Sequence, residues 1–299
     1  MSDIIYAQDK RYPGPAIASP KAGEILTQEQ LDAVNPLYSW AEVKEIARAG
    51  RLERFGRAGK VQYTYERWKA HVIQEHGTLE KCLKMNNLPW GEESDEADAN
   101  VQKEHAVDGG DAYLRWDKMK YGKDKTWAVL RNQMPYALPR DVRHFVVWVR
   151  VPIYNPELVH GDKDKWEKIQ NEGLGGFTGI IPPADDCSNL ILPSGAPPTP
   201  TRQDFFASLS PSTGDWHHYD QLRGCAEIRK WYGVRYEAEG GHEVGRMVRA
   251  LWDERGWECV WVANPARIQS IPGLAHFHVF ARRKTPDEID ASEAVWGTD

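Results

Sequence analysis

The sequence has few cysteines and lacks any long apolar run. Its four cysteines lie far apart and form no metal-type pair: Cys82, Cys187, Cys225 and Cys259. We expect reduced thiols, as is usual in the cytosol. No apolar run approaches the ~20 residues that a membrane-spanning helix needs. The first residues carry no basic region followed by an apolar one, so no secretory signal is expected. These absences predict a cytoplasmic protein without membrane association.

Motifs of several common enzyme classes are also absent. No Gly-rich phosphate fingerprint follows a predicted strand, which argues against a Rossmann or P-loop nucleotide site. No Gly-x-Ser-x-Gly motif marks a serine nucleophile. The paired carboxylates Asp185 and Asp186 are only a weak sign of acid–base chemistry.

Charge is unevenly distributed along the 299 residues. The formal net charge is −6. Residues 91–111 hold eight acidic residues against Lys103, which makes this segment −7 and leaves about +1 for the rest. The segment is poor in large apolar residues, so it is predicted to be a mobile loop. The near-neutral remainder can carry local basic patches.

Helix signals recur through the first half of the chain. Residues 1–36 are interpreted as an extended arm. Ser39 followed by Glu42 has capping-box spacing, which predicts a helix to about Gly50. A second helix is expected to end at Gly77, because apolar residues before it recur at helical spacing. A helix is also predicted over 112–131.

Three segments have the composition of strands: 144–151, 258–262 and 274–280. Further helices are predicted at 166–173, 220–231 and 244–251, a long Pro-rich loop over 182–202, and a frayed acidic tail over 285–299. The order favours a single α+β domain over 37–284, in which helices cover a small central sheet. The last two strands are expected to pair with each other and to lie beside the first.

The segment from His276 to His278 has the clearest chemical potential. Alternate side chains of a strand share a face, so these two imidazoles project together. Three interpretations remain open: a hydrogen-bonded structural pair, a polar pocket without metal, and a metal site. A metal site needs a third ligand, and the sequence identifies none.

A second polar group precedes and enters the first strand. Asn132, Tyr136 and Asp141 lie in a turn made rigid by two prolines, and His144 and Trp148 share a face of the strand. A pocket wall and an aromatic-packed turn explain this pattern equally well.

Basic residues gather in two segments. Those of the first are Lys44, Arg48, Arg51, Arg54, Arg57 and Lys60, and the segment 115–125 adds Lys118, Lys120 and Lys123. Such patches attract phosphate backbones, although solvated surface is the simpler interpretation.

A resemblance to a known family rests on four blocks of residues that occur in order. The first is Leu37-Tyr-Ser-Trp40 with Leu52 and Phe55, and the second is Leu88-Pro-Trp90. The third runs from Asn132-x-x-Pro-Tyr136 through Pro139-x-Asp141 and His144 to Trp148, and the fourth from Trp261-x-x-Asn-Pro265 through His276-Phe-His-Val-Phe280. Together they span nearly the whole globular part. The chain resembles a fungal family described as a domain of unknown function, which includes arginine-containing cyclodipeptide synthases and N-acetylglucosamine-induced proteins. Asn132-Gln-Met-Pro-Tyr136 departs from the usual Asn-Asp-Trp-Pro-Tyr, so subfamily or substrate can differ.

The resemblance implies a transferase of fungal secondary metabolism. Such an enzyme takes arginine from arginyl-tRNA, joins it to a second amino acid supplied free or as aminoacyl-tRNA, and releases a cyclo-Arg-Xaa diketopiperazine. Because the ester is already activated, no ATP, other cofactor or metal is expected, and DNA is not an expected partner. The alternative is a non-enzymatic cytosolic protein of the same family that binds a metabolite or a partner.

Candidate residues for this chemistry follow from residue type. A neutral base is needed to deprotonate the attacking amine, for which the candidates are His276, His278 and His144. Neutral donors are needed for the tetrahedral oxyanion, for which Asn132, Tyr136 and Asn264 are plausible. Candidate substrate-binding residues are Asp141, Asp185, Asp186, Trp148, Trp261 and Asn264, and the basic residues above are candidates for tRNA binding.

Overall fold

The computed structural model describes residues 37–91, 95–106, 110–119, 126–180 and 234–290. Three predictions fall outside these residues: the arm over 1–36, the loop over 182–202 and the helix over 220–231. None of the helices in the described ranges is long and apolar enough to cross a membrane.

Six strands form one sheet in the order β1-β2-β6-β5-β3-β4, and all neighbouring pairs are antiparallel. The strands are β1 (Trp127–Arg131), β2 (Val142–Val149), β3 (Leu174–Ile180), β4 (Val234–Glu237), β5 (Trp257–Ala263) and β6 (His276–Arg283). The sheet does not close into a barrel, and with its helices it confirms the predicted α+β class. The three predicted strands are the adjacent central strands β2, β6 and β5.

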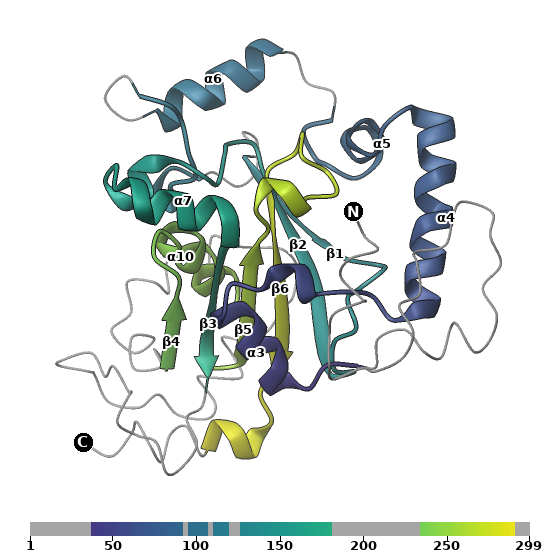
Figure 1. Ribbon diagram of the computed structural model, residues 1–299, viewed down its shortest axis with the longest axis vertical. Helices are drawn as coiled ribbons and strands as arrows, with labels where there is room; N and C mark the ends of the chain where they lie inside the picture. The colour runs from purple at the N-terminus through teal and green to yellow at the C-terminus, as the bar shows by residue number, and fades with distance from the viewer. Residues whose placement is uncertain (1–36, 92–94, 107–109, 120–125, 181–233, 291–299) are drawn as a thin grey trace.

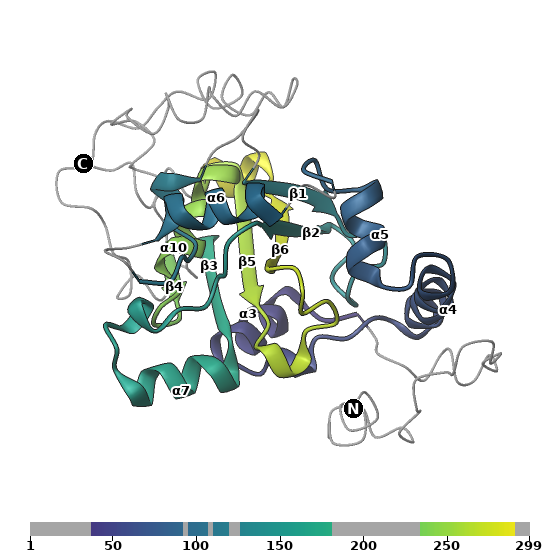
Figure 2. The same ribbon diagram turned by 90° about the horizontal axis from the view of Figure 1, so that it is seen from above.

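Helices lie on both sides of this sheet (Figures 1 and 2). They are α3 (Trp40–Arg48), α4 (Gly59–His76), α5 (Leu79–Asn86), α6 (Asp95–His105), α7 (Lys163–Glu172) and α10 (His242–Leu251). Single turns of 3-10 helix are η1 (Leu52–Arg54), η2 (Trp116–Lys118), η3 (Pro156–Val159) and η6 (Ala266–Ile268).

Alternation along β6 divides the interior between the two faces of the sheet. Phe277 and Val279 face α10 and η2, where they join a large apolar cluster that we call the α10 core. Phe280 faces the other way and packs under α3 in a second cluster, the α3 core. A third cluster, the α5 core, covers β1 and β2 on the α3 side and includes residues of α4 and α5 as well as Trp148. Figure 2 shows α3 and α10 on opposite sides of the sheet.

Local signals place the helix ends as predicted. The Ser39 hydroxyl accepts a hydrogen bond from the Glu42 amide at 3.2 Å, and the Glu42 carboxylate accepts one from the Ser39 amide at 2.8 Å. This capping box satisfies amides that the first turn of α3 leaves unpaired. Gly77 closes α4 and Gly173 closes α7, as expected.

Three predictions need correction. Where a loop was expected over 91–111, the structure has α6, because Val101 and His105, one turn apart, are both buried. The predicted helix over 112–131 is wrong: the segment contains η2 and ends in β1, whose Trp127 and Val129 alternate into the α10 core. The tail predicted to fray from 285 is helical over 286–290 and buries Ile289.

The packing of Trp261 depends on a glycine in the neighbouring strand. A Cβ on Gly176 would lie 2.6 Å from the Trp261 ring and from the Tyr236 carbonyl oxygen. We expect Gly176→Ala to lower the free energy of unfolding by about 1–3 kcal/mol, as overpacking of a filled core does. Gly273→Ala is the control, since its Cβ would meet only the flexible Glu80 side chain, at 3.2 Å. Urea denaturation measures both, and equal losses would contradict the prediction.

Candidate functional site

Strands β2 and β6 bring three predicted histidines together on the α3 side of the sheet. His276 and His278 occupy alternate positions of β6, and His144 lies on the neighbouring β2. In the strand register, Val146 pairs with His278 and Trp148 with His276. His144, His276 and His278 are 2%, 4% and 7% exposed, so all three residues are almost fully removed from water.

His144 and His278 are bonded directly to each other. The His144 Nε2 and His278 Nδ1 atoms lie 2.9 Å apart. The other ring nitrogen of His144, Nδ1, accepts a hydrogen bond from the Tyr136 backbone amide at 3.2 Å. The turn before β2 is therefore attached to β6 through an imidazole pair.

Tyr136 and Asn264 complete one side of this group. The Tyr136 ring centroid lies 4.8 Å from that of His144 and 5.3 Å from that of His278. The Asn264 side-chain amide lies 3.5 Å from His278 Nε2 and also hydrogen bonds to the Tyr136 side chain. Tyr136, His144, Asn264 and His278 thus form one polar group that joins the turn before β2 to the ends of β5 and β6.

Arg57 contributes the charge nearest to this group. Its guanidinium carbon lies 3.8 Å from the ring centroid of Tyr65 and 5.5 Å from that of Tyr136, and its Nε donates to the Met134 carbonyl at 2.9 Å. The Phe55 ring stacks on the Tyr136 ring. The two ring centroids lie 5.8 Å apart and the ring planes are at 4° to each other. A cation held on aromatic faces is well placed to attract an anion or a developing negative charge.

His276 has different surroundings from the other two histidines. Its Nδ1 lies 2.7 Å from the Leu274 carbonyl oxygen, and its ring centroid is 4.7 Å from that of Trp148. The buried Trp148 indole nitrogen makes no hydrogen bond within the described part of the chain.

Burial keeps the site uncharged. It lowers the pKa of His276, and it lowers the pKa values of His144 and His278 well below the ordinary value, with the Arg57 cation acting in the same direction. Burial raises the pKa of the Tyr136 phenol, against the opposing effect of Arg57. No acidic side chain of the described ranges makes a hydrogen bond or ion pair with these imidazoles. The group therefore offers neutral imidazoles, a phenol and an amide near one guanidinium.

The other predicted site residues do not join this group. Asn132 shapes the turn through two hydrogen bonds. Its side-chain oxygen accepts from the Met134 backbone amide at 2.9 Å, and its backbone amide donates to the His144 carbonyl oxygen. Asp141 is exposed just before β2, and Asp185 and Asp186 lie outside the described residues. Trp261 is fully buried on the opposite face of the sheet, in the α10 core, so it does not share a pocket wall with His278.

The basic residues of 44–60 have several different environments. Arg57 belongs to the histidine group, and Lys44 lies 3.4 Å from the buried Glu258 carboxylate. Arg48 pairs with Glu45 at 2.6 Å on the surface. Arg51 is exposed, Arg54 is half-buried, and the Lys60 side chain is outside the described set.

The described residues of the second basic segment, 115–119, lie on the other side of the sheet from these cations. Trp116 of η2 lies in the α10 core, and its backbone amide donates to Glu243 of α10 at 2.6 Å. Lys118 is exposed there, whereas Lys120 and Lys123 lie outside the described residues. Within the described residues, Lys118 therefore does not share a patch with the cations of 44–57 around the histidines.

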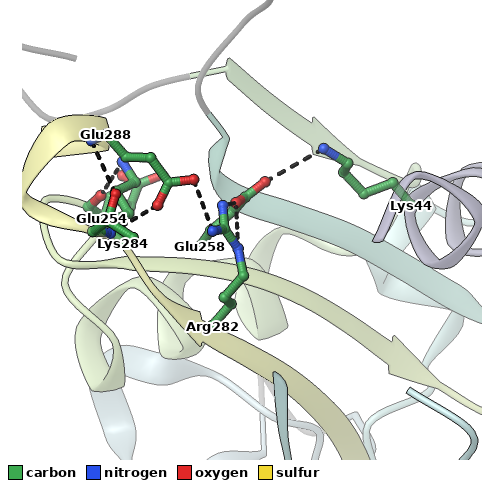
Figure 3. A network of polar contacts seen from close by, with 7 residues as sticks. Lys44, Glu254, Glu258, Arg282, Lys284 and Glu288 are labelled. Atoms are coloured by element: carbon green, nitrogen blue, oxygen red, sulfur yellow. Dashed lines mark hydrogen bonds and ion pairs between the residues drawn. The ribbon is translucent and has the colours of Figure 1, made fainter. Parts of the chain in front are cut away.

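An ionic network that the sequence did not suggest lies at the other end of β5 and β6 (Figure 3). Glu258 is bonded by Arg282 on the adjacent strand and by Lys44 of α3, and Arg282 also bonds Glu288 at 2.7 Å. Glu258 and Arg282 lie opposite each other in the strand register. The available signal was Glu258 in the otherwise apolar strand β5, with Arg282 at an alternate position of β6.

Lys284 lies beside this network (Figure 3) and is itself buried. Its ammonium donates to the Glu254 carbonyl oxygen at 2.9 Å, and burial lowers its pKa to about 8. The Glu254 carboxylate in turn accepts from the Gly179 amide at 3.1 Å, which links the end of β6 to β3. These contacts fix the lower end of the sheet and are remote in register from the histidines.

Comparisons with known proteins give a partial match. Residues 39–172 match the family model described as "Protein of unknown function (DUF3605)". This range contains Tyr136 and His144, but the segment from Trp261 to Phe280 lies outside it, so the match covers less of the chain than the resemblance suggested. No curated protein matches. A solved structure titled "Crystal Structure of HTC1" aligns over 85% of this chain and 92% of its own at 16% identity, and its TM-score of 0.33 is too low to carry an argument.

The neutral histidines make the stability of the fold sensitive to acid. Their folded pKa values lie below that of the unfolded chain, so the unfolded state binds more protons as pH falls below about 6.5. Stability is then lost at about 1.4 kcal/mol per pH unit for each such histidine. We expect a His144→Gln, His278→Asn double variant to show a slope shallower by about 3 kcal/mol per pH unit between pH 6 and 5.

Urea denaturation at several pH values measures this slope. His71→Gln is the control, since His71 is 64% exposed on α4. An unchanged slope in the double variant would show that these two imidazoles do not resist protonation.

Proposed function

We propose that this protein is a tRNA-dependent aminoacyltransferase that joins arginine from arginyl-tRNA to a second amino acid and forms a cyclo-Arg-Xaa diketopiperazine. It would be one of the arginine-containing cyclodipeptide synthases of fungal secondary metabolism. The main support is a single observation: neutral imidazoles, a phenol, an amide and a guanidinium gather at one place from four separate segments of the chain.

Aminoacyl transfer needs this set of groups. The attacking α-amine must give up a proton, which a neutral imidazole can accept. The ester carbonyl becomes a tetrahedral oxyanion, which the Tyr136 hydroxyl and the Asn264 amide would stabilise as fixed donors, with the Arg57 charge behind them. The ester bond then breaks and the 3′-oxygen of the tRNA leaves as a hydroxyl. Ring closure repeats this step: the terminal α-amine of the dipeptide attacks the ester of the second amino acid, so this route takes both amino acids as aminoacyl-tRNA.

The substrate arginine side chain would bind away from Arg57, because two guanidinium groups repel each other. The face of Trp148 is a suitable platform on the His276 side of the site. Asp185 and Asp186 stay the proposed carboxylate partners for that guanidinium. Asp141 precedes the opposite end of β2, seven residues or about 23 Å from Trp148, and is too far away to share it.

The test of this proposal is direct. Purified protein incubated with arginyl-tRNA and each of the twenty amino acids, free and as aminoacyl-tRNA, is expected to give a cyclic arginine dipeptide with at least one partner. Mass spectrometry detects the product, and ribonuclease treatment removes it. The absence of product from verified charged tRNA would reject the synthase. Ligand-dependent thermal stabilisation without turnover would then indicate a metabolite-binding protein.

The tRNA would contact the surface around Arg48, Arg51 and Arg54, on the same side of the sheet as the histidines. Arg51→Ala is expected to weaken tRNA binding and to reduce the slope of log affinity against log salt by about 1, the value for one lost phosphate contact. Filter binding between about 50 and 200 mM salt measures this. Lys103→Ala on α6 is the matched control, and an equal effect there would point to a diffuse charge effect in place of a contact at Arg51.

A further inference from the structure

The hydrogen bonds of His144 and His278 determine where their ring protons lie. A backbone amide can only donate, so His144 Nδ1 accepts from Tyr136 and carries no proton. A neutral His144 then carries its proton on Nε2 and donates it to His278 Nδ1, 2.9 Å away. His278 in turn carries its proton on Nε2, 3.5 Å from the Asn264 side chain, and this tautomer requires Asn264 to turn its amide oxygen, in place of its NH2 group, toward that proton. Both acceptor nitrogens of this pair are therefore already occupied within the protein.

His276 has the opposite tautomer. A carbonyl oxygen can only accept, so His276 Nδ1 must donate its proton to Leu274. The lone pair of a neutral His276 is thus on Nε2, for which the described residues provide no hydrogen-bond donor. The carbonyl fixes the ring orientation in the way that a carboxylate does in Asp–His pairs.

We propose that His276 is the proton acceptor of this site, and that the His144–His278 pair positions Tyr136 and Asn264. This assignment rests on the proposed aminoacyl transfer for its chemistry. In that step the amine nitrogen forms a bond to the ester carbonyl carbon and its proton moves to His276 Nε2. The tetrahedral intermediate then breaks its carbon–oxygen ester bond, and His276 returns the proton to the departing 3′-oxygen. The second amide bond of the ring forms by the same exchange, when the terminal α-amine of the dipeptide attacks the ester of the second aminoacyl-tRNA and releases that tRNA, so no oxidant or metal is needed.

The ring tautomers can be measured without any assay of activity. Long-range proton–nitrogen correlation spectra of protein with ¹⁵N-labelled histidine distinguish protonated from unprotonated ring nitrogens. We expect a bare Nε2 on His276 and a bare Nδ1 on both His144 and His278, with assignments made from single variants. A protonated Nε2 on neutral His276 would overturn the proposal, whether or not the protein makes a dipeptide.

Matched substitutions on one strand test the role in turnover. An Asn side chain can keep the hydrogen bond that Nδ1 makes but has no basic nitrogen. At position 276 it would donate to the Leu274 carbonyl, and at position 278 it would accept from His144. We expect His276→Asn to lower kcat by about 10²- to 10⁴-fold, the usual contribution of a general base, and His278→Asn to lower it less than tenfold. Added imidazole should restore part of the activity of His276→Ala and none of that of His278→Ala.

These outcomes separate the two proposals. A wild-type protein that makes no dipeptide removes the proposed function, and the tautomers alone then decide whether His276 is the acceptor of the site. A wild-type protein that makes the dipeptide, with equal losses in His276→Asn and His278→Asn and no imidazole rescue, keeps the function and rejects His276 as its base. Thermal unfolding of each variant confirms that the comparison is made between folded proteins.

Discussion

Strand β6 is buried on both faces, and this constraint governs the interior. It lies between β2 and β5 at the centre of the sheet, so its residues as far as Ala281 are buried, and a polar group among them is costly unless it finds a partner within the protein. On one face, apolar residues fill the α10 core. On the other face the sequence His-x-His-x-Phe-x-Arg places two imidazoles at one end and a guanidinium at the other. Each end has recruited partners from distant segments, and Phe280 with Val260 separates the two polar groups.

The two ends satisfy this constraint in different ways. Glu258 and Arg282 neutralise each other, and with Lys44 and Glu288 they form a closed ionic network whose function is to hold α3 and the C-terminal helix against the sheet. At the histidine end, burial lowers the pKa values of the imidazoles and keeps them neutral. A paired network resists change in charge, whereas neutral imidazoles near a cation can accept a transient proton or face a transient anion. This contrast is why the histidine end is the better candidate for chemistry.

The sequence predicted the α+β class, the three central strands and the faces of their side chains, since period-two alternation is a local property of β2 and β6. It also predicted several helix ends, because caps such as Ser39 and Gly77 act within one turn. It missed β1, β3 and β4. The first and last of these strands are short and β3 is rich in glycine, so their local sequence favours no strand, and they become strands only by pairing with neighbours. It placed Trp261 with His278 because both lie in one block of sequence. In the strand register Trp261 pairs with Val279, which faces the α10 core, whereas His278 faces the opposite side of the sheet. Arg57 was assigned to tRNA, since no sequence pattern shows that its guanidinium lies on Tyr65 and Tyr136.

The order of the strands has a consequence for how the protein is made. The centre of the sheet joins β2 to the last two strands, and the imidazole bond connects residues 134 positions apart in the chain. During synthesis, β1 and β2 leave the ribosome with one long edge unpaired until β6 follows, and long-range pairing of this kind is slow. Residues 39–172, the range matched by the family model, therefore include His144 but not the strand that completes its surroundings. The histidine group exists only once the chain has been made through β6, so a product truncated before β6 would lack both the group and the middle of its sheet.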